Sequence, residues 1–147
     1  MLPSLLKVIT SASLALLVAA HGHAQKRGGD AIIAMIAAPP SLDAQATSAQ
    51  VARNINLHIY ETLYARDENA RVVPDLADGV SISSDGLTYV FSLRQGVKFH
   101  NGKEMTSADV VASLDRYRKA GASANLVRAI ESVTATGPYR VTVKLGS

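Results

Sequence analysis

Two stretches of the sequence alternate apolar and polar residues, and this pattern restricts the chain to a fold that contains antiparallel sheet. The first stretch, 80–93, is interrupted only by the Ser-Asp-Gly turn at 84–86. The second, 139–145, follows a Gly-Pro pair at 137–138. Successive side chains on a strand point to opposite faces, so this alternation predicts strands with one buried face. We therefore predict two antiparallel hairpins, and we expect the strand over 139–145 to leave an exposed edge.

Helices are predicted where apolar residues recur about every four positions. Residues 47–50 have the spacing of a capping box, in which side chains satisfy free amides at a helix start. The apolar residues that follow on one face are Val51, Ile55, Ile59 and Leu63. We predict an amphipathic helix over 48–63, a second helix over 106–119 and a short helical or irregular segment over 126–133.

One apolar run lacks any alternation. The sequence AIIAMIAA over 31–38 ends at two prolines, 39–40. A short continuous apolar run that is closed by prolines fits a strand buried on both faces, because proline cannot donate to a sheet ladder. We therefore predict a central strand over 31–38.

The first 24 residues have the layout of a secretory signal peptide. Lys7 precedes an apolar run over 8–20, and small residues stand at positions 22 and 24. The apolar run is shorter than the about 20 residues that span a bilayer. Because the chain has no cysteine, a lipid anchor on a cysteine at the cleavage site is excluded. We predict cleavage after Ala24 and a soluble, exported mature protein.

The absence of cysteine also excludes disulfides, thiol nucleophiles and cysteine-ligated metals, so the mature chain must depend on its apolar core. Without Lys7, the 15 basic and 12 acidic residues leave a net charge of about +2, which is too small and too dispersed for binding nucleic acid. The remaining length suffices for one small domain. We expect no nucleic-acid partner, no metal and no cofactor.

Short motifs follow one another in a fixed order over 74–118. They are Leu76-Ala77, Ser84-Asp85-Gly86, Arg94, Gly96, Phe99-His100-Asn101-Gly102 and Thr106 to Val110, preceded upstream by Ser41-Leu42-Asp43 and Tyr60-Glu61-Thr62-Leu63. In order and spacing they resemble the amino-terminal part of the family 5 extracellular solute-binding proteins, the peptide, dipeptide and nickel receptors of ABC importers. The resemblance spans 28–147, although Ala44 and Val80 replace a proline and a tryptophan that are usual in the family.

The resemblance implies an α/β fold of the type II periplasmic-binding-protein class, with a mixed sheet, antiparallel hairpins and flanking helices. Full members are longer and close a cleft between two lobes, so it also implies a truncated member whose binding is impaired by itself. Three segments are expected: a signal peptide over 1–24, the first strand and entry to the first ligand-binding lobe over 25–50, and part of an additional lobe over 51–147.

The implied function is that of the periplasmic substrate-binding component of an ABC importer, not that of an enzyme. Such a protein would act as a monomer, bind a peptide or another small solute and dock on membrane permease subunits. Family position alone implies the ligand-facing residues, which are Ala37, Ala38, Pro39, Pro40, Ala124 and Asn125. The backbone of 37–40 would pair with an extended peptide by strand addition. A structural module that binds no solute, or a gene remnant, remains an alternative.

A catalytic interpretation exists only for the polar stretch 97–110. His100 together with Asp109 or Glu104 would suit proton transfer in an exported hydrolase, but no nucleophile elbow or metal signature accompanies them. We expect instead that His100 bonds to backbone in a turn and that both carboxylates lie at a helix start, where negative charge is favourable. The cluster of Arg116, Tyr117, Arg118 and Lys119 is interpreted as a solvated helix end.

Overall fold

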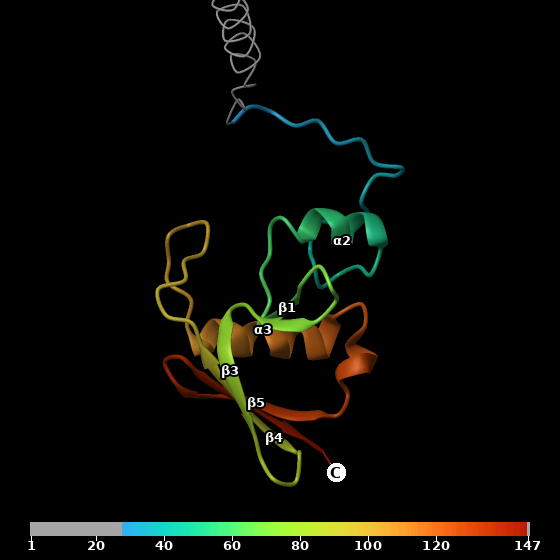
Figure 1. The fold of residues 1–147 in the computed structure, drawn as a ribbon. Coiled ribbons are helices and arrows are strands. Elements are labelled where there is room, and N and C mark those ends of the chain that lie inside the picture. Colours follow the sequence, from blue (N-terminus) through green and yellow to red (C-terminus); the bar gives the residue numbers. More distant parts are fainter. Residues whose placement is uncertain (1–27, 147) are drawn as a thin grey trace, which may run out of the picture. The chain divides into compact units, whose positions relative to one another are not determined.

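A computed structural model describes residues 28–146 (Figure 1), so the predicted signal peptide over 1–24 lies outside the described residues. The chain divides into two compact units, Met1–Ala34 and Met35–Ser147, and every element described below belongs to the second. In chain order the elements are helix α2 (Gln50–Asn56), strands β1 (Tyr64–Arg66), β2 (Val72–Pro74), β3 (Ala77–Ile82) and β4 (Thr88–Leu93), helix α3 (Ser107–Ala120), 3₁₀-helix η1 (Ala124–Val127), and strands β5 (Ile130–Gly137) and β6 (Arg140–Leu145).

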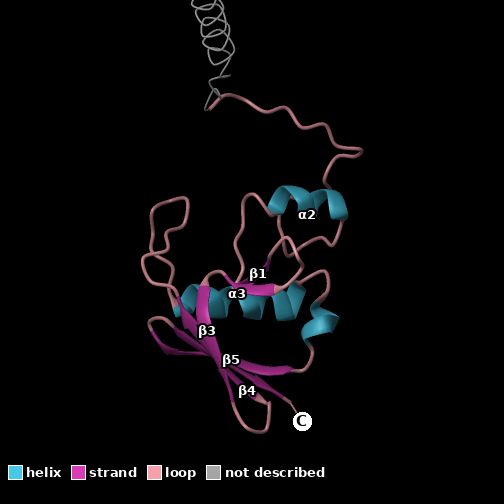
Figure 2. Cartoon of the chain, in the orientation of Figure 1, coloured by secondary structure: helices cyan, strands magenta, loops and turns pink. Residues whose placement is uncertain are grey.

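Strands β3, β4, β5 and β6 form one sheet below α3 (Figure 2). Its strand order is β3-β4-β6-β5, and every neighbouring pair is antiparallel. Both predicted hairpins are confirmed, β3-β4 around Gly86 (φ +72°) and β5-β6 after Gly137. The prediction of an exposed edge at 139–145 is wrong, because β6 pairs with β4 on one side and with β5 on the other. The two hairpins are thereby joined into one sheet. No parallel pair occurs in residues 28–146.

Helix α3 crosses one face of this sheet and covers the core (Figure 1). Its start is the predicted one: the carboxylate of Asp109 accepts hydrogen bonds from the amide and the hydroxyl of Thr106, both at 2.9 Å. The helix ends where the amide of Gly121 donates to the carbonyl of Tyr117 at 2.8 Å. The prediction of a helix over 106–119 is confirmed to within one residue at each end.

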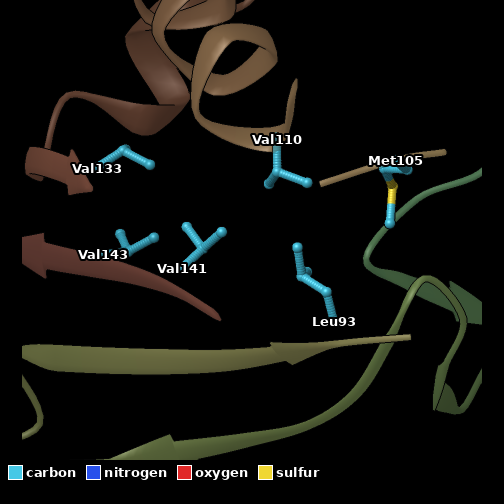
Figure 3. Close-up of a cluster of buried hydrophobic side chains, with 6 residues drawn as sticks. All are labelled: Leu93, Met105, Val110, Val133, Val141 and Val143. Atoms are coloured by element: carbon cyan, nitrogen blue, oxygen red, sulfur yellow. The ribbon is translucent and has the colours of Figure 1, made fainter. Parts of the chain in front are cut away.

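The core lies between α3 and the sheet. Its buried side chains, shown in Figure 3, are Leu93, Met105, Val110, Val133, Val141 and Val143. Alternation places Leu93 of β4 and Val141 of β6 on the face toward α3, while their polar neighbours along each strand lie on the opposite face. Val141 is completely buried at the centre of the sheet. Burial of these apolar side chains is the main stabilising contribution that this chain makes to its own fold.

Helix α2 is shorter than predicted, because the chain turns after Asn56. The amides of Ile59 and Tyr60 both donate to the carbonyl of Asn56, and the fourth apolar residue of the predicted helix, Leu63, packs instead against the core of the sheet. The predicted capping box is also wrong. The N-cap is Ala49, and the hydroxyl of Thr47 accepts a hydrogen bond from the backbone amide of Ala49 at 3.1 Å. A short two-stranded sheet, β1-β2, follows α2.

The segment 126–133 differs from its prediction, since only its beginning belongs to the 3₁₀-helix η1 and strand β5 starts at Ile130. A register shift between Ile130 and Ser132 adds one residue to β5. Because of this bulge, Ile130 and Val133 both pack into the core although they are three residues apart. Spacing of three is typical of a helix, and the bulge therefore disguised the strand in the sequence.

The predicted central strand over 31–38 is not formed. This run forms neither helix nor strand and is exposed, and the side chain of Ile36 is fully accessible. A buried strand needs neighbours that accept and donate along its backbone. No described strand pairs with this run, so apolar composition alone did not produce a strand here.

Candidate functional site

The first segment expected to face ligand, 37–40, is a loop in which only Pro39 is partly buried. It leads directly into a tight turn over 41–46. The amide of Asp43 donates to the hydroxyl of Ser41 at 3.0 Å, and the amide of Gln45 donates to the Asp43 carboxylate at 2.9 Å. A backbone bond from Ala46 to the Asp43 carbonyl, 3.1 Å long, closes the turn. Short-range hydrogen bonds of this kind fix the backbone conformation of the segment that directly follows the loop over 37–40.

Four side chains fasten this turn to helix α3, and we call Asp43, Gln45, Ser113 and Arg116 the loop clamp. The guanidinium of Arg116 binds both carboxylate oxygens of Asp43, with a distance of 3.1 Å from Nη1 to Oδ1. The same Nη1 donates to Oε1 of Gln45 at 2.8 Å. The side-chain Nε2 of Gln45 donates to the carbonyl and the hydroxyl of Ser113, at 3.1 and 3.0 Å. The turn is thereby cross-linked to the helix.

The electrostatics of the clamp follow from this geometry. The hydrogen bond from Arg116, together with the amide of Gln45, lowers the pKa of Asp43 to about 2. In return, the hydrogen bond and charge of Asp43 raise the pKa of Arg116. Both side chains remain accessible, Arg116 at 55% and Asp43 at 37%. The pair is therefore ionised throughout the physiological range and screened by solvent.

The second segment expected to face ligand lies on η1. Ala124 lines a cavity of about 270 Å³, whose other lining residues are Asp115, Arg118, Lys119, Val127, Arg128 and Ile130. Asn125 is exposed, and its backbone carbonyl accepts a hydrogen bond from Nε of Arg128 at 3.2 Å. Just before η1, the amide of Ala122 donates to the carbonyl of Gln45 at 2.8 Å. The structure therefore brings the turn that follows 37–40 against the turn that precedes Ala124.

Sequence reasoning missed the loop clamp. The interpretation of the cluster over 116–119 as a solvated helix end is incomplete for two of its members. Arg116 binds Asp43, and Arg118 donates to the carboxylate of Asp115 at 3.0 Å as well as to two strand carbonyls at 2.9 Å. One signal was available, since Ser113 and Arg116 are three residues apart on the predicted helix and thus form a polar stripe on one face.

The polar stretch around His100 is a turn and a helix start, as predicted. His100 is exposed, and the structure shows no hydrogen bond to its imidazole from residues 28–146, so the predicted backbone bond is not observed. The carboxylate of Glu104 accepts a hydrogen bond from the hydroxyl of Tyr139 at 2.7 Å and another from the amide of Gly96 at 3.0 Å. Together these bonds lower the pKa of Glu104. The ion pair with Lys103, at 2.7 Å, is the main cause that lowers the pKa of Asp109 to about 2.

Both carboxylates of this stretch thus have structural partners. Neither the bonds of Glu104 nor those of Asp109 involve His100. A general base needs a raised pKa and a proton within hydrogen-bond reach, whereas both of these pKa values are lowered. The arrangement stabilises a turn and a helix start and offers no acid–base pair.

Within 28–146, no group of three or more His, Asp or Glu side chains is arranged to hold a metal ion. In the same range, no helix combines the length and the apolar character that crossing a bilayer requires. A second, smaller cavity of about 180 Å³ is lined by Glu61, Pro74, Asp75, Leu76, Arg94 and Val97.

Comparison with known proteins gives one family match. Residues 71–147 match the family described as bacterial extracellular solute-binding proteins, family 5, in its middle part. The glutathione-binding protein GsiB of Pectobacterium atrosepticum is 38% identical over 87 residues, covering 59% of this chain and 17% of that protein. The chain thus spans less than a fifth of the length of this relative.

Solved structures of similar fold give the same result. The oligopeptide-binding protein AppA of Bacillus subtilis, solved with a nonapeptide, has a TM-score of 0.63 and 31% identity, over 69% of this chain and 21% of that one. OppA of Listeria monocytogenes, solved bound to peptide, has a TM-score of 0.68 and 27% identity, over 74% and 25% of the two chains. These neighbours are type II periplasmic-binding proteins, and they confirm the expected α/β fold class.

Proposed function

Because this chain belongs to the family 5 bacterial extracellular solute-binding proteins, we propose that it is part of the periplasmic substrate-binding component of an ABC importer for peptides or similar solutes. The observation that carries the proposal is the family match over 71–147, which includes strand β2, the whole four-stranded sheet and helix α3. Relatives of this chain are named for glutathione and oligopeptide binding. A short peptide is the solute class that these names share.

The chain would contribute one part of the receptor. We assign 25–50 to the first strand and entry of a ligand-binding lobe and 51–147 to part of an additional lobe. In this assignment the loop over 37–40 and the residues Ala124 and Asn125 face the solute. Support comes from the hydrogen bond between Ala122 and Gln45, which holds the approaches to these two segments against each other.

By itself the chain should bind solute weakly. A receptor of this kind gains affinity when two lobes enclose the solute, because the closed state makes contacts that the open state lacks. The chain spans about a fifth of its relatives and would supply one wall of such a cleft. The exposed apolar run over 31–38 is consistent with a strand whose neighbours belong to other parts of a receptor.

The partners and the location follow from the same proposal. The predicted signal peptide over 1–24 would deliver the protein to the periplasm without a lipid anchor. There the closed receptor, as a monomer, would present its solute to the permease subunits in the membrane. The rival hydrolase would need His100 to act with Asp109 or Glu104, and the partners of these carboxylates give it no support.

Calorimetric titration tests the proposal. The receptor-length protein that carries this sequence is titrated with alanine peptides of two to nine residues and with glutathione, alongside the 147-residue chain. We expect saturable binding of at least one of these probes by the longer protein and no tight binding by the chain alone. Absence of binding by the longer protein would contradict the proposed solute class, and tight binding by the chain alone would contradict the two-lobe account.

A further inference from the structure

The loop clamp joins two parts of the chain that are far apart in sequence. Its hydrogen bonds span separations of 68 to 73 residues, from the turn over 41–46 to helix α3. Each polar atom of the Gln45 side chain is engaged, Oε1 by Arg116 and Nε2 by Ser113. Arg116 contacts both Asp43 and Gln45 directly, and it reaches Ser113 only through the Gln45 side chain.

The clamp also occupies a particular place in the molecule. It begins three residues after Pro40, which ends the first proposed solute-facing segment. Its Gln45 carbonyl accepts the amide of Ala122, two residues before Ala124 in the second segment. A displacement of the turn over 41–46 relative to α3 would therefore change the spacing between the two segments.

The chemistry of the clamp suits orientation better than stabilisation. Exposed ion pairs contribute little to folding free energy, since solvent screens them and side-chain entropy opposes them. Arg116 and Asp43 are both accessible, at 55% and 37%. A guanidinium that binds both oxygens of a carboxylate nevertheless fixes the relative angle of the two groups, which a single bond from lysine does not.

We propose that Arg116 is a positioning residue for solute binding: through Asp43 and Gln45, it holds the loop over 37–40 in register with Ala124 and Asn125. This inference rests on the proposed function. Arg116 acts on the solute through other residues, and its loss lets the loop move while the sheet and helix α3 stay folded.

The test compares variants of the receptor-length protein. Arg116→Gln and Asp43→Asn each remove the bidentate contact. The double variant combines both substitutions and removes the same single contact. Arg116→Lys keeps the charge but lacks the planar fork. Asp78→Asn is the matched control, because Asp78 is an exposed carboxylate, 58% accessible, in an ion pair with Arg94 at 3.4 Å. Affinity for the alanine peptides and glutathione is measured by calorimetry, and thermal midpoints are recorded without ligand.

Affinity should fall roughly tenfold in Arg116→Gln and in Asp43→Asn, as is usual for coupling between sites. The double variant should be no weaker than either single variant, because both remove one interaction. Arg116→Lys should recover part of the affinity, while Asp78→Asn and all unliganded midpoints should match the wild type.

Three results would overturn the inference. Unchanged affinity in the clamp variants would show that Arg116 does not position the loop, while leaving the proposed function intact. A loss of affinity in parallel with a lowered thermal midpoint, or an equal loss in Asp78→Asn, would show a general effect on folding. Failure of the wild-type receptor to bind any probe would overturn the proposed function and the inference together.

Discussion

Individual carboxylates fix the irregular parts of this chain. Asp43 organises the turn over 41–46 and binds Arg116, while Asp109 binds the amide of Thr106 and the ammonium of Lys103. Each carboxylate accepts from charged donors and from backbone amides at once. Hydrogen bonds of this kind favour the ionised form, which is why the pKa of each is lowered to about 2.

The lowered pKa of Asp109 predicts a loss of stability in acid. With a folded-state pKa near 2 and an ordinary value of 3.8, the Asp109 carboxyl group stabilises the fold above about pH 4, and this contribution is lost as the pH falls toward 2. The solvent-screened pair of Asp43 and Arg116 adds little to this pH dependence. Urea unfolding between pH 7 and pH 2 should therefore show a smaller acid-dependent loss in Asp109→Asn than in the wild type. The Asp78→Asn control, which keeps both carboxylates, should follow the wild type. Identical pH profiles for Asp109→Asn and the wild type would refute this assignment.

Gly121 is required by a close approach at the end of α3. A Cβ at this position would lie 2.6 Å from both the carbonyl oxygen and the ring carbon Cδ2 of Tyr117. Because the carbonyl belongs to the helix backbone, it cannot move away without cost. We expect Gly121→Ala to lower the free energy of unfolding by about 2 kcal/mol, as is typical of overpacking. Gly79→Ala, where a Cβ meets nothing within 4 Å, should not destabilise the fold in the same urea experiment.

Elements were predictable where their pattern is local. The hairpin over 80–93 and helix α3 followed from alternation, a turn and a capping pair, all within a few residues of each other. Helix α2 and strand β5 were not predicted correctly, because a turn after Asn56 and a bulge after Ile130 interrupt their periods. Neither interruption contains a glycine or a proline that would have marked it in the sequence.

The packing of α3 on the sheet predicts a sharp contrast between two leucines. Leu93 is 3% exposed in the core, whereas Leu126 is 78% exposed on η1. Leu93→Ala should lower the free energy of unfolding by about 3 kcal/mol, through lost burial and a residual cavity. Leu126→Ala makes the same chemical change and should stay within about 0.5 kcal/mol of the wild type. Equal effects in chemical denaturation would contradict the position of the core.

At the scale of the whole molecule, the candidate site could not be predicted from local sequence. The proposed solute-facing segments rest only on a family resemblance, and the clamp depends on hydrogen bonds between residues 68 to 73 positions apart. The structure of the run over 31–38 is likewise not predictable from its local sequence. Its apolar composition indicates burial, but no strand among the described residues provides the neighbours that burial needs.

Ile36 tests whether that run is buried in a longer receptor. Its side chain is fully exposed in this chain, so Ile36→Ser should change the free energy of unfolding of the chain by no more than about 0.5 kcal/mol. In the receptor-length protein the same change should cost about 2 kcal/mol or more, because a polar group would replace a buried apolar one. Equal, small effects in both proteins would contradict the assignment of 31–38 to a buried strand.

The most direct test of the central claim is a native mass measurement of the endogenous protein. An antibody against 74–118 would capture it from a periplasmic extract, and its mass would be recorded before and after denaturation. We predict a receptor-sized protein that releases a small peptide or similar solute on denaturation. A protein of 15.5 kDa or less without any bound solute would contradict the claim that this chain serves as part of a solute receptor.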